Sequence, residues 1–556
     1  FIGGFVMHRL KRPPLLGYLL GGLILGSFAP DIIIRKEDLT TIGQIGIAFL
    51  LFTLGVELSF DKLRKVGKVA IVGAILQMVF LGVLSMLFLP KLLGLSAQTS
   101  LFLGITFSLS STAVVTKMLS DRGEIDTAHG ELLIAWLLVQ DLAVVPILIF
   151  FPLFLTSQSF GMEFFLSSFA ALGKAVGIIC ATYILGRKIL TPFAKRMFGD
   201  LSRELLLILT ILVAIASVFA FTLVGLPGSI GAFLAGLILS GRASSHAIFS
   251  EIRPFRDLFS AMFFVLLGTI VSLPFIILHL GNIIALGLFE MIAVFLTTVV
   301  ILAFFGLHTK ILFLTAIGLF SIGEFAFVVA GAFFSQGFIS QEMYSLILSV
   351  SVFLLLLAPW QIQTAPALYS KIKKMVRKTP ALYNQIFGRL DFEEPYDEAS
   401  FADHVIICGH GRVGREISAI LNFAQIPFIV IDFNRHVVSM LRAKGIPTFY
   451  GDPSDYDILD LAKAEHARAI LIALPDRHSQ ELIIRNALRL NPKILIICRS
   501  HFDEDRIPLL SIGANVVVQP EFEAGVSMGR YTLVAFGKHT MKSEEFIKQL
   551  KKGLEI

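Results

Sequence analysis

Long runs of apolar residues, separated by short polar loops, fill the chain up to about residue 365. Of all residues, 55% are hydrophobic and only 16% are charged. A backbone that crosses hydrocarbon must pair its own N–H and C=O groups, so runs of this length predict membrane-spanning helices. The opening run before His8 is too short to span, and we expect it to be the remainder of a longer first helix. With that one included, about thirteen helices are expected, the others at about residues 15–28, 41–58, 68–89, 98–118, 130–155, 164–186, 204–224, 228–241, 256–272, 283–305, 311–334 and 343–364.

Lys and Arg gather in the loops on one side of these expected helices, which makes that side cytoplasmic by the positive-inside rule. The same count places the part after residue 365 in the cytoplasm. We therefore expect a multi-pass protein of a bacterial-type inner (plasma) membrane with a cytoplasmic C-terminal domain. The net charge of +6 requires no nucleic-acid partner, because the excess basic residues belong to these loops and to the linker. Three cysteines, Cys180, Cys408 and Cys498, predict no disulfide framework.

Asp141 lies in the middle of the apolar run 135–146, directly after Gln140. A charged side chain in hydrocarbon costs about 3 kcal/mol or more, so an acid in such a place is expected to be functional. A buried carboxylate that binds either a proton or a cation is the simplest device for exchanging one for the other. One titratable group predicts exchange of one charge for one, which is electroneutral antiport. The alternative is that Asp141 only joins helices by hydrogen bonds.

Two of the apolar runs are interrupted by small and polar residues. The run 104–118 carries four hydroxyl side chains at mid-depth, on Ser108, Ser110, Ser111 and Thr112, and the run 318–331 carries Ser321, Gly323 and Glu324. By the order of the expected helices, these two cross the membrane in opposite directions. Such a pair predicts inverted repeats with two crossing broken helices and an ion site at mid-membrane. The half-helix ends there present carbonyls to a cation and positive N-termini to a carboxylate.

The candidate ion site consists of Asp141, Gln140, Thr112, Ser111 and Glu324, with K⁺ or Na⁺ at Asp141. Gln140 cannot titrate, and its amide is expected to orient either neighbouring side chains or a broken helix. Thr112 and Ser111 are candidate oxygen ligands for a dehydrated alkali cation. The alternative for these hydroxyls is a bond back to a carbonyl one turn earlier. Glu324 is expected either to bind the ion or to face the positive N-terminus of a half-helix.

A dinucleotide-binding fingerprint follows the membrane part. Gly409, Gly411 and Gly414 form G-x-G-x-x-G between the apolar strand 405–408 and an amphipathic helix, and Asp432 ends the next apolar strand. The glycines let backbone N–H groups approach a phosphate, and the acid accepts hydrogen bonds from ribose hydroxyls. The alternative is a Rossmann fold without a nucleotide. Strands are expected at about residues 405–408, 427–432, 446–450, 469–473, 494–498 and 515–518, which together with the helical patterns between them predict a doubly wound α/β sheet.

Four segments follow from these patterns: a transmembrane domain at 1–365, a cytoplasmic linker at 366–401, a nucleotide-binding domain at 402–520 and a helical C-terminal extension at 521–556. No nucleophile with a base accompanies the glycine motif, and no second domain is present to bring a hydride acceptor. We therefore expect a protein that is not an enzyme and that is regulated by a bound nucleotide.

The motifs together resemble the Kef-type members of the cation:proton antiporter-2 family, over nearly the whole chain. They are "IGIAFLLFTLGVEL" (45–58), "LSSTAVV" (109–115), "LLVQDLAVVP" (137–146), "GAFLAGLILS" (231–240), "GEFAFVVAGA" (323–332) and the domain at 402–518, which is similar to RCK or TrkA-N domains. The resemblance implies an NhaA-like antiporter fold in a polytopic α-helical membrane protein, joined to a cytosolic Rossmann-like RCK domain. It also implies a homodimer that exchanges potassium, sometimes sodium, for protons across the lipid bilayer by an elevator-like motion.

By motif, the resemblance assigns ion binding and proton exchange to Asp141, with Gln140 as its companion. It places Ser111 and Thr112 at the unwound crossing of the broken helices. It assigns binding of a regulatory adenine nucleotide (AMP or NAD(H)) to Gly409, Gly411, Arg412, Gly414, Asp432, Asp452 and Arg499. Glutathione-gated relatives carry an acidic loop where this chain has "SSHAIFSEIRPFRD" (244–257) and a second arginine where it has His501. The resemblance therefore does not imply glutathione gating.

Three other functions remain open at this point. A sodium/proton antiporter of the same fold would use the same oxygen ligands. A ligand-gated potassium channel would need a filter of backbone carbonyls, and the chain has no TVGYG-like segment. A third possibility is a membrane scaffold for a cytosolic redox sensor.

Overall fold

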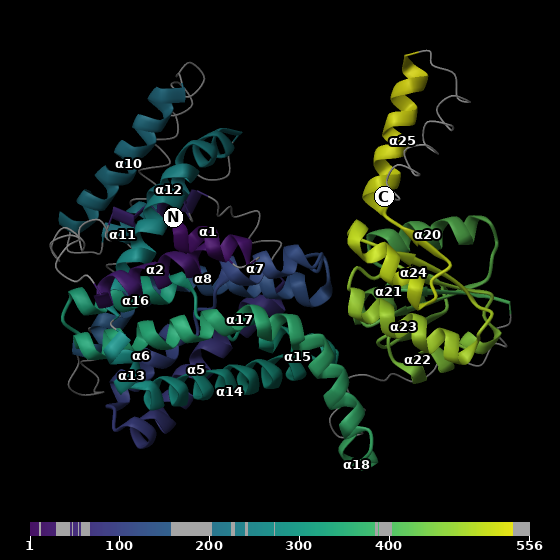
Figure 1. Cartoon of the computed structure of the whole chain (residues 1–556), viewed down its shortest axis with the longest axis horizontal. Coiled ribbons are helices and arrows are strands. Elements are labelled where there is room, and N and C mark those ends of the chain that lie inside the picture. The colour runs from purple at the N-terminus through teal and green to yellow at the C-terminus, as the bar shows by residue number, and fades with distance from the viewer. Residues whose placement is uncertain are drawn as a thin grey trace. The chain divides into compact units, whose positions relative to one another are not determined.

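A computed structural model of the chain describes residues 1–10, 13–28, 67–156, 203–223, 228–239, 243–271, 273–383, 387 and 403–536, together with most of 45–56. The helix expected at 164–186, much of the one expected at 41–58, residues 388–401 of the linker expected at 366–401, and the residues after 536 lie outside this set. The chain divides into two compact units (Figure 1). The first unit comprises Phe1–Met118, His129–Phe305 and Phe313–Ala365. The second comprises Leu119–Ala128, Gly306–Leu312 and Pro366–Ile556.

Helices build the described part of the first unit. Four of them are long and apolar enough to cross a membrane, namely α5, residues 128–148 of α8, α14 and α17. The helical bounds are α1 (Ile2–Arg9), α2 (Pro14–Phe28), α5 (Lys68–Leu93), α6 (Ala97–Phe107), α7 (Thr112–Asp121), α8 (Ala128–Thr156), α10 (Arg203–Leu223), α11 (Gly228–Leu239), α12 (Ala243–Ile270), α13 (Leu273–Leu278), α14 (Leu280–Phe304), α15 (Thr309–Gly318), α16 (Glu324–Ser335) and α17 (Gln341–Val376).

Helix α17 extends further than the apolar pattern predicts. Its expected end was near residue 364, whereas the helix continues to Val376. The added turns carry Lys373 and Lys374 in the last turn, where positive side chains complement the negative end of the helix dipole. A short helix, α18 (Pro380–Tyr383), follows.

The two interruptions expected in the apolar runs are confirmed. The run expected as one span at 98–118 is divided into α6 and α7, which are separated by residues 108–111. The run expected at 311–334 is divided into α15 and α16, which are separated by residues 319–323. The first break, residues 108–111, contains three serines, whereas the second, residues 319–323, contains Ser321 and Gly323 among bulky apolar residues.

The second unit contains a six-stranded sheet in the order β3-β2-β1-β4-β5-β6, and every neighbouring pair is parallel. This is the order of a doubly wound nucleotide-binding fold, so the predicted sheet is confirmed. The strands are β1 (Val405–Cys408), β2 (Phe428–Asp432), β3 (Thr448–Tyr450), β4 (Ala469–Ile472), β5 (Leu495–Arg499) and β6 (Val516–Val518). The helices are α20 (Arg412–Phe423), α21 (Arg435–Ala443), α22 (Tyr456–Leu461), α23 (Arg477–Leu490), α24 (Arg506–Ile512) and α25 (Pro520–Ala535).

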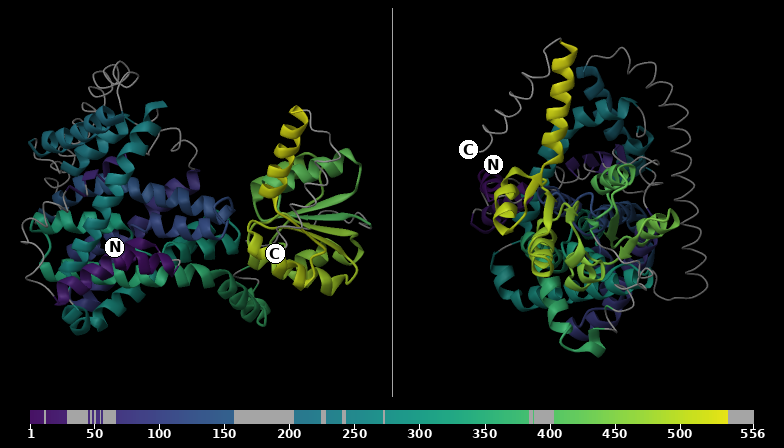
Figure 2. Two further views of the ribbon diagram at one scale, coloured as in Figure 1. Left: turned by 45° about the horizontal axis from the view of Figure 1, so that its top comes forward. Right: turned by 90° about the vertical axis from the view of Figure 1, so that its right-hand side faces the viewer.

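Helices cover both faces of this sheet (Figure 2). On one face, Ile407 and Val430 pack with Leu441 of α21, and residues of α20 lie against the same cluster. On the other face, residues of β1, β2, β4 and β5 pack with residues of α22, α23 and α24. Because side chains alternate between the faces of a strand, a run of apolar residues such as "VIIC" in β1 is buried on both sides.

Candidate functional site

The backbones of the two broken helices pair with each other at their breaks. Ser110 and Ile322 form an isolated antiparallel bridge. The N–H of Ser111 donates to the carbonyl of Ser321 at 3.1 Å, and the N–H of Gly323 donates to the carbonyl of Leu109 at 2.7 Å. These bonds satisfy backbone groups that the breaks remove from the helices, which must find partners inside a membrane protein. The crossing of two broken helices, predicted from the interrupted runs, is therefore present in the structure.

Four hydroxyl groups at the first break have four different partners. Ser108 Oγ bonds back to the carbonyl of Ile105 at 2.6 Å, which is the purely local role. Ser110 Oγ donates to the carbonyl of Leu319 at 2.9 Å and so joins the two broken helices. Ser111 Oγ accepts from the N–H of Val114 at 3.4 Å, in the first turn of α7. The hydroxyl of Thr112 instead contacts a carboxylate.

Thr112 Oγ1 donates to Asp141 Oδ2 at 2.8 Å. Asp141 lies on α8, is 4% exposed and reaches the first residue of α7. The N-terminus of a helix carries a partial positive charge, so this position favours a carboxylate. The structure thus brings Asp141 and Thr112 together at the crossing, as the sequence predicted.

Gln140, the residue before Asp141, holds the other side of the same break. Its Oε1 accepts from the N–H of Ser110 at 3.1 Å, and its Nε2 donates to Gln77 Oε1 at 3.0 Å. Of the two roles left open for Gln140, the geometry matches the orientation of a broken helix. Gln77 on α5 was not identified from the sequence, because a single amide in an apolar run gives no indication of its partner.

Glu324 is the first residue of α16, in the positive first turn of that helix. This place corresponds to the electrostatic capping role, while ion binding by Glu324 stays a prediction. Among the described residues no group of three or more His, Cys, Asp or Glu side chains converges. The hydrogen bonds at the crossing place hydroxyl, amide and carboxylate oxygens there, and such hard oxygens suit an alkali cation.

In the second unit, the three glycines of the fingerprint lie between β1 and α20. A Cβ atom on Gly414 would come within 2.0 Å of the carbonyl oxygen of Gly409, so only glycine fits there. A Cβ on Gly411 would meet nothing within 4 Å, so this loop borders open space at the N-terminus of α20. An open, positive helix end is what the motif provides for a phosphate.

Asp432 ends β2 beside this loop. Its carboxylate accepts from the N–H of His410 at 2.8 Å and from the N–H of Asn434 at 2.8 Å. Burial raises the pKa of this carboxyl above its ordinary value, although the backbone N–H donors act in the opposite direction. The acid is thus fixed next to the glycine loop, where the fingerprint requires it.

The other three predicted nucleotide ligands have protein partners in the structure. Arg412 forms an ion pair with Asp126. Arg499 lies 3.8 Å from the carboxylate of Glu521, with its Nε buried and unpaired. Asp452, which is 1% exposed, lies 2.8 Å from the ammonium of Lys310. These contacts do not test whether the three residues bind a nucleotide, so that role stays a prediction.

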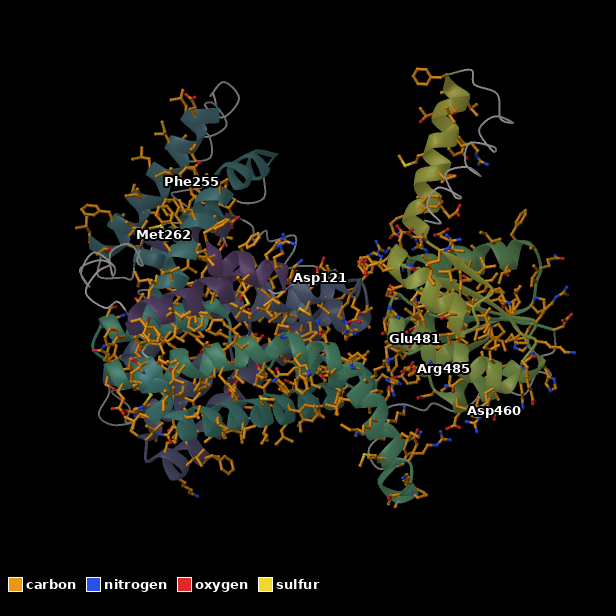
Figure 3. The ribbon with its side chains drawn as sticks, viewed as in Figure 1. Asp121, Phe255, Met262, Asp460, Glu481 and Arg485 are labelled. Carbon is orange, nitrogen blue, oxygen red and sulfur yellow. The ribbon has the colours of Figure 1, made fainter. Side chains whose placement is uncertain are left out.

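The pair of Lys310 and Asp452 is part of a buried polar cluster. Lys310 Nζ also donates to Ser479 Oγ at 2.7 Å, in the first turn of α23, the helix that carries Glu481 and Arg485 (Figure 3). Burial would lower the pKa of Lys310, but Asp452 and Asp476 outweigh it and raise that pKa. Burial would likewise raise the pKa of Asp452, but the positive charge of Lys310 holds it below its ordinary value. Lys310 belongs to the segment 306–312, which the sequence did not connect with the nucleotide-binding fold.

Comparison with known proteins identifies the first unit. The family model described as "Sodium/hydrogen exchanger, transmembrane" matches residues 1–365, which is more than half of the chain. The chain belongs to the sodium/hydrogen exchanger family. A second model, the TrkA-N domain, matches residues 405–520 of the exchanger. The exchanger is thus an integral membrane protein whose membrane part is followed by a TrkA-N domain.

Two relatives of the exchanger match this chain over most of their own length. It is 29% identical over 539 residues to YbaL of Escherichia coli (strain K12), a candidate cation/proton antiporter, covering 95% of this chain and 94% of that one. It is 27% identical to KefB of Alkalimonas amylolytica, a candidate K⁺ efflux antiporter, covering 99% of this chain and 83% of that one. The resemblance to Kef-type proteins is therefore confirmed.

A solved structure supports the fold. The sodium proton antiporter MjNhaP1 from Methanocaldococcus jannaschii matches with a TM-score of 0.51 and 19% identity, covering 66% of this chain and 94% of that one. At this identity the match concerns the fold alone, and it confirms the expected antiporter fold of the membrane part.

Proposed function

We propose that the exchanger transports potassium out of the cytoplasm in return for protons, with one ion exchanged for one at Asp141. Alternating access would expose this carboxylate first to one side of the membrane and then to the other. We also propose that the protein works as a homodimer, that its second unit lies in the cytoplasm, and that a nucleotide bound there regulates transport.

The observation that carries this proposal is the hydrogen bond from Thr112 to Asp141 at the crossing of the two broken helices. A buried acid at the positive end of a half-helix is stabilised when charged, yet it remains able to take a proton in its apolar surroundings. A hydroxyl partner serves both states, because it donates to a carboxylate and can accept from a protonated acid.

The residues of the crossing divide the work between them. Asp141 holds either the proton or the cation. Thr112 supplies a neutral oxygen beside it and keeps the carboxylate at the end of α7. Gln140 and the pairing of Ser110 with Ile322 fix the broken backbone, so that the ligands keep their places while the ion changes. A single carboxylate then carries either one proton or one monovalent cation, which supports electroneutral exchange.

Regulation is supported by the ion pairs that two of the predicted nucleotide-binding residues form. Arg412 pairs with Asp126 of the segment 119–128, and Asp452 pairs with Lys310 of the segment 306–312. Helix α7 ends at Asp121 and α15 begins at Thr309, so both segments are continuous with halves of the broken helices. A nucleotide that binds Arg412 or Asp452 would compete with these ion pairs and so change what both segments contact.

The decisive experiment is a flux assay with the full-length protein in liposomes, in which a proton gradient drives uptake of potassium or sodium. We expect potassium-dependent proton exchange that disappears in Asp141→Asn, because asparagine keeps an acceptor for Thr112 but cannot titrate. The matched control is Glu290→Gln, which removes another buried acid, on α14, and is expected to leave exchange intact.

Four results would contradict the proposal. Proton-coupled exchange that survives in Asp141→Asn would show that the site is wrong. Potassium flux without proton movement would favour a channel, and exchange driven only by sodium would favour the sodium/proton alternative. A rate that depends on the membrane potential would rule out one-for-one exchange.

Nucleotide binding is tested separately by thermal unfolding of the full-length protein with AMP or NADH. We expect a rise in the unfolding temperature that disappears in Gly411→Leu, because the leucine side chain would fill the open space beside the α20 N-terminus. A rise of the same size in the variant would contradict the placement of the phosphate.

A further inference from the structure

We propose that Gln77 of α5 is a positioning residue for the ion site. Its side-chain oxygen fixes the amide of Gln140, and Gln140 in turn fixes the backbone at the break between α6 and α7. The inference rests on the proposed function, because it concerns the site at which Asp141 would exchange ions.

A chain of directed hydrogen bonds carries the proposal. The backbone N–H of Ser110 can only donate, so the group of Gln140 that lies 3.1 Å from it must be the amide oxygen. The amide nitrogen of Gln140 then points away from Ser110 and needs an acceptor. Gln77 Oε1 supplies one at 3.0 Å. The orientation of Gln140 is therefore determined by a donor on one side and an acceptor on the other.

Burial makes the loss of this orientation costly in free energy. Gln77 and Gln140 are both 0% exposed, so water cannot replace either partner. A buried amide that loses its partner costs about 1–3 kcal/mol, as much as or more than the bond that Gln140 makes to Ser110. Without an acceptor at residue 77, the orientation of Gln140 that holds the break leaves its amide nitrogen buried and unpaired, so this orientation becomes less stable by about that amount.

Helix packing sets the distance between the two glutamines. A Cβ on Gly73 of α5 would lie 2.4 Å from the ring of Trp136 on α8, so the two helices are in close contact there. Gln77 and Gln140 are each one turn further along their helices, and residues four apart share a face of a helix. The contacts 73–136 and 77–140 thus advance together, so α5 and α8 run in the same direction through this contact.

The effect reaches Asp141 through the next residue. Gln140 binds the backbone at Ser110, and Asp141 binds the side chain of Thr112, so consecutive residues of α8 hold the break on both sides of Ser111. If Gln140 releases Ser110, the backbone that leads into α7 loses one of its two attachments to α8. Thr112 and the α7 N-terminus then lose their fixed place relative to the carboxylate.

Replacement of Gln77 by leucine, which has a similar volume and no acceptor, tests the role of the oxygen. In the liposome assay we expect Gln77→Leu to raise the apparent KM for potassium about tenfold with a smaller change in kcat, since one hydrogen bond's worth of binding free energy corresponds to about that factor. We expect Gln77→Glu to restore KM to within about twofold of the wild type, because a buried, protonated glutamic acid keeps a carbonyl acceptor in the same place.

The matched control is Ser85→Ala, which removes another buried polar atom from α5 and is expected to leave KM unchanged. If Gln77→Leu does not fold, Gln77→Met provides the same loss of acceptor with a flexible side chain. An unchanged KM in the leucine or methionine variant would overturn the proposal, as would a glutamate variant that is as impaired as either. If Asp141→Asn keeps proton-coupled exchange, the proposed function fails. If that variant is inactive and Gln77→Leu behaves as the wild type, only the inference about Gln77 fails.

Discussion

Two buried carboxylates, one in each unit, each make a close contact, one with a neutral group and the other with a charged group. Asp141 in the first unit accepts a hydrogen bond from the neutral hydroxyl of Thr112 at 2.8 Å. Asp452 in the second unit lies 2.8 Å from the ammonium of Lys310, which Ser479 also contacts. Both acids are at most 4% exposed, so burial alone does not distinguish them.

The difference indicates what each acid is able to do. A carboxylate paired with a buried ammonium must stay charged, because loss of either charge leaves the other unpaired at a cost of several kcal/mol. A hydroxyl partner imposes no such condition, since it donates to the charged form and accepts from the protonated form. The same residue type thus suits structural pairing in one unit and exchange in the other.

The largest expected effect is the loss of transport in Asp141→Asn. Exchange should fall to the level of protein-free liposomes, because the only change is the loss of a titratable group. Asp452→Asn should retain basal exchange while it weakens the second unit. If instead both variants lose exchange equally, the contrast between the two acids is wrong.

Lys310→Met should destabilise the second unit by about 3–5 kcal/mol, because it leaves Asp452 buried without its counter-charge. Hydrogen exchange of peptides within 403–536 of the full-length protein measures this loss. Lys493→Met, at an exposed lysine, is the control and should change stability by less than about 0.5 kcal/mol. The double variant Lys310→Met with Asp452→Leu should recover much of the loss, since an apolar pair can replace a buried ion pair. A small effect of Lys310→Met would show that this pair is not structural.

Thr112→Val tests whether the hydroxyl that contacts Asp141 contributes to transport. Removal of the hydroxyl should weaken transport of potassium by about tenfold or more, since hydrogen bonds to charged groups contribute about 1.5–3 kcal/mol. Thr116→Val, one turn further along α7, changes a threonine outside the crossing and should be close to wild type. Equal effects of the two variants in the flux assay would argue against a role for the Thr112 hydroxyl.

The smallest expected effect is the acid response of the second unit. The folded state holds the pKa of Asp452 below its unfolded value, so its contribution to stability is complete above about pH 4 and is lost as the pH falls through the lowered pKa. Lys310 has a raised pKa, so its contribution is lost only as the pH rises above about 10. Between about pH 4 and pH 10, the ion pair of Lys310 and Asp452 should therefore cause little change in the hydrogen exchange of the second unit. Below pH 4 the loss should be at most about 1.4 kcal/mol per pH unit and absent in Asp452→Asn.

Much of the fold could be predicted because its signals are local. The interruptions at residues 108–111 and 319–323 follow from small and polar residues inside apolar runs, and the structure confirms both. The six strands were expected within two residues of their observed bounds, because each is a short apolar run between turns. The end of α17 was placed too early, since an amphipathic continuation with lysines does not resemble an apolar span.

The site was predicted less completely. Asp141 was identified because a charge in an apolar run is conspicuous, and Thr112 because it lies in an interrupted run. Gln77 was missed although it is buried completely, and Lys310 was not identified either. In both cases the partner lies far away in the sequence, at Gln140 and at Asp452, and no local pattern connects the two.

By itself, the sequence determined that the chain enters a membrane, where its helices break and where a nucleotide-binding fold begins. These features depend on the cost of placing polar groups in hydrocarbon and on backbone geometry that only glycine allows, and both are written into neighbouring residues. Only the tertiary structure decided which buried polar groups meet. A hydrogen bond or an ion pair needs two atoms about 3 Å apart, and helix packing brings together residues that the chain itself keeps far apart.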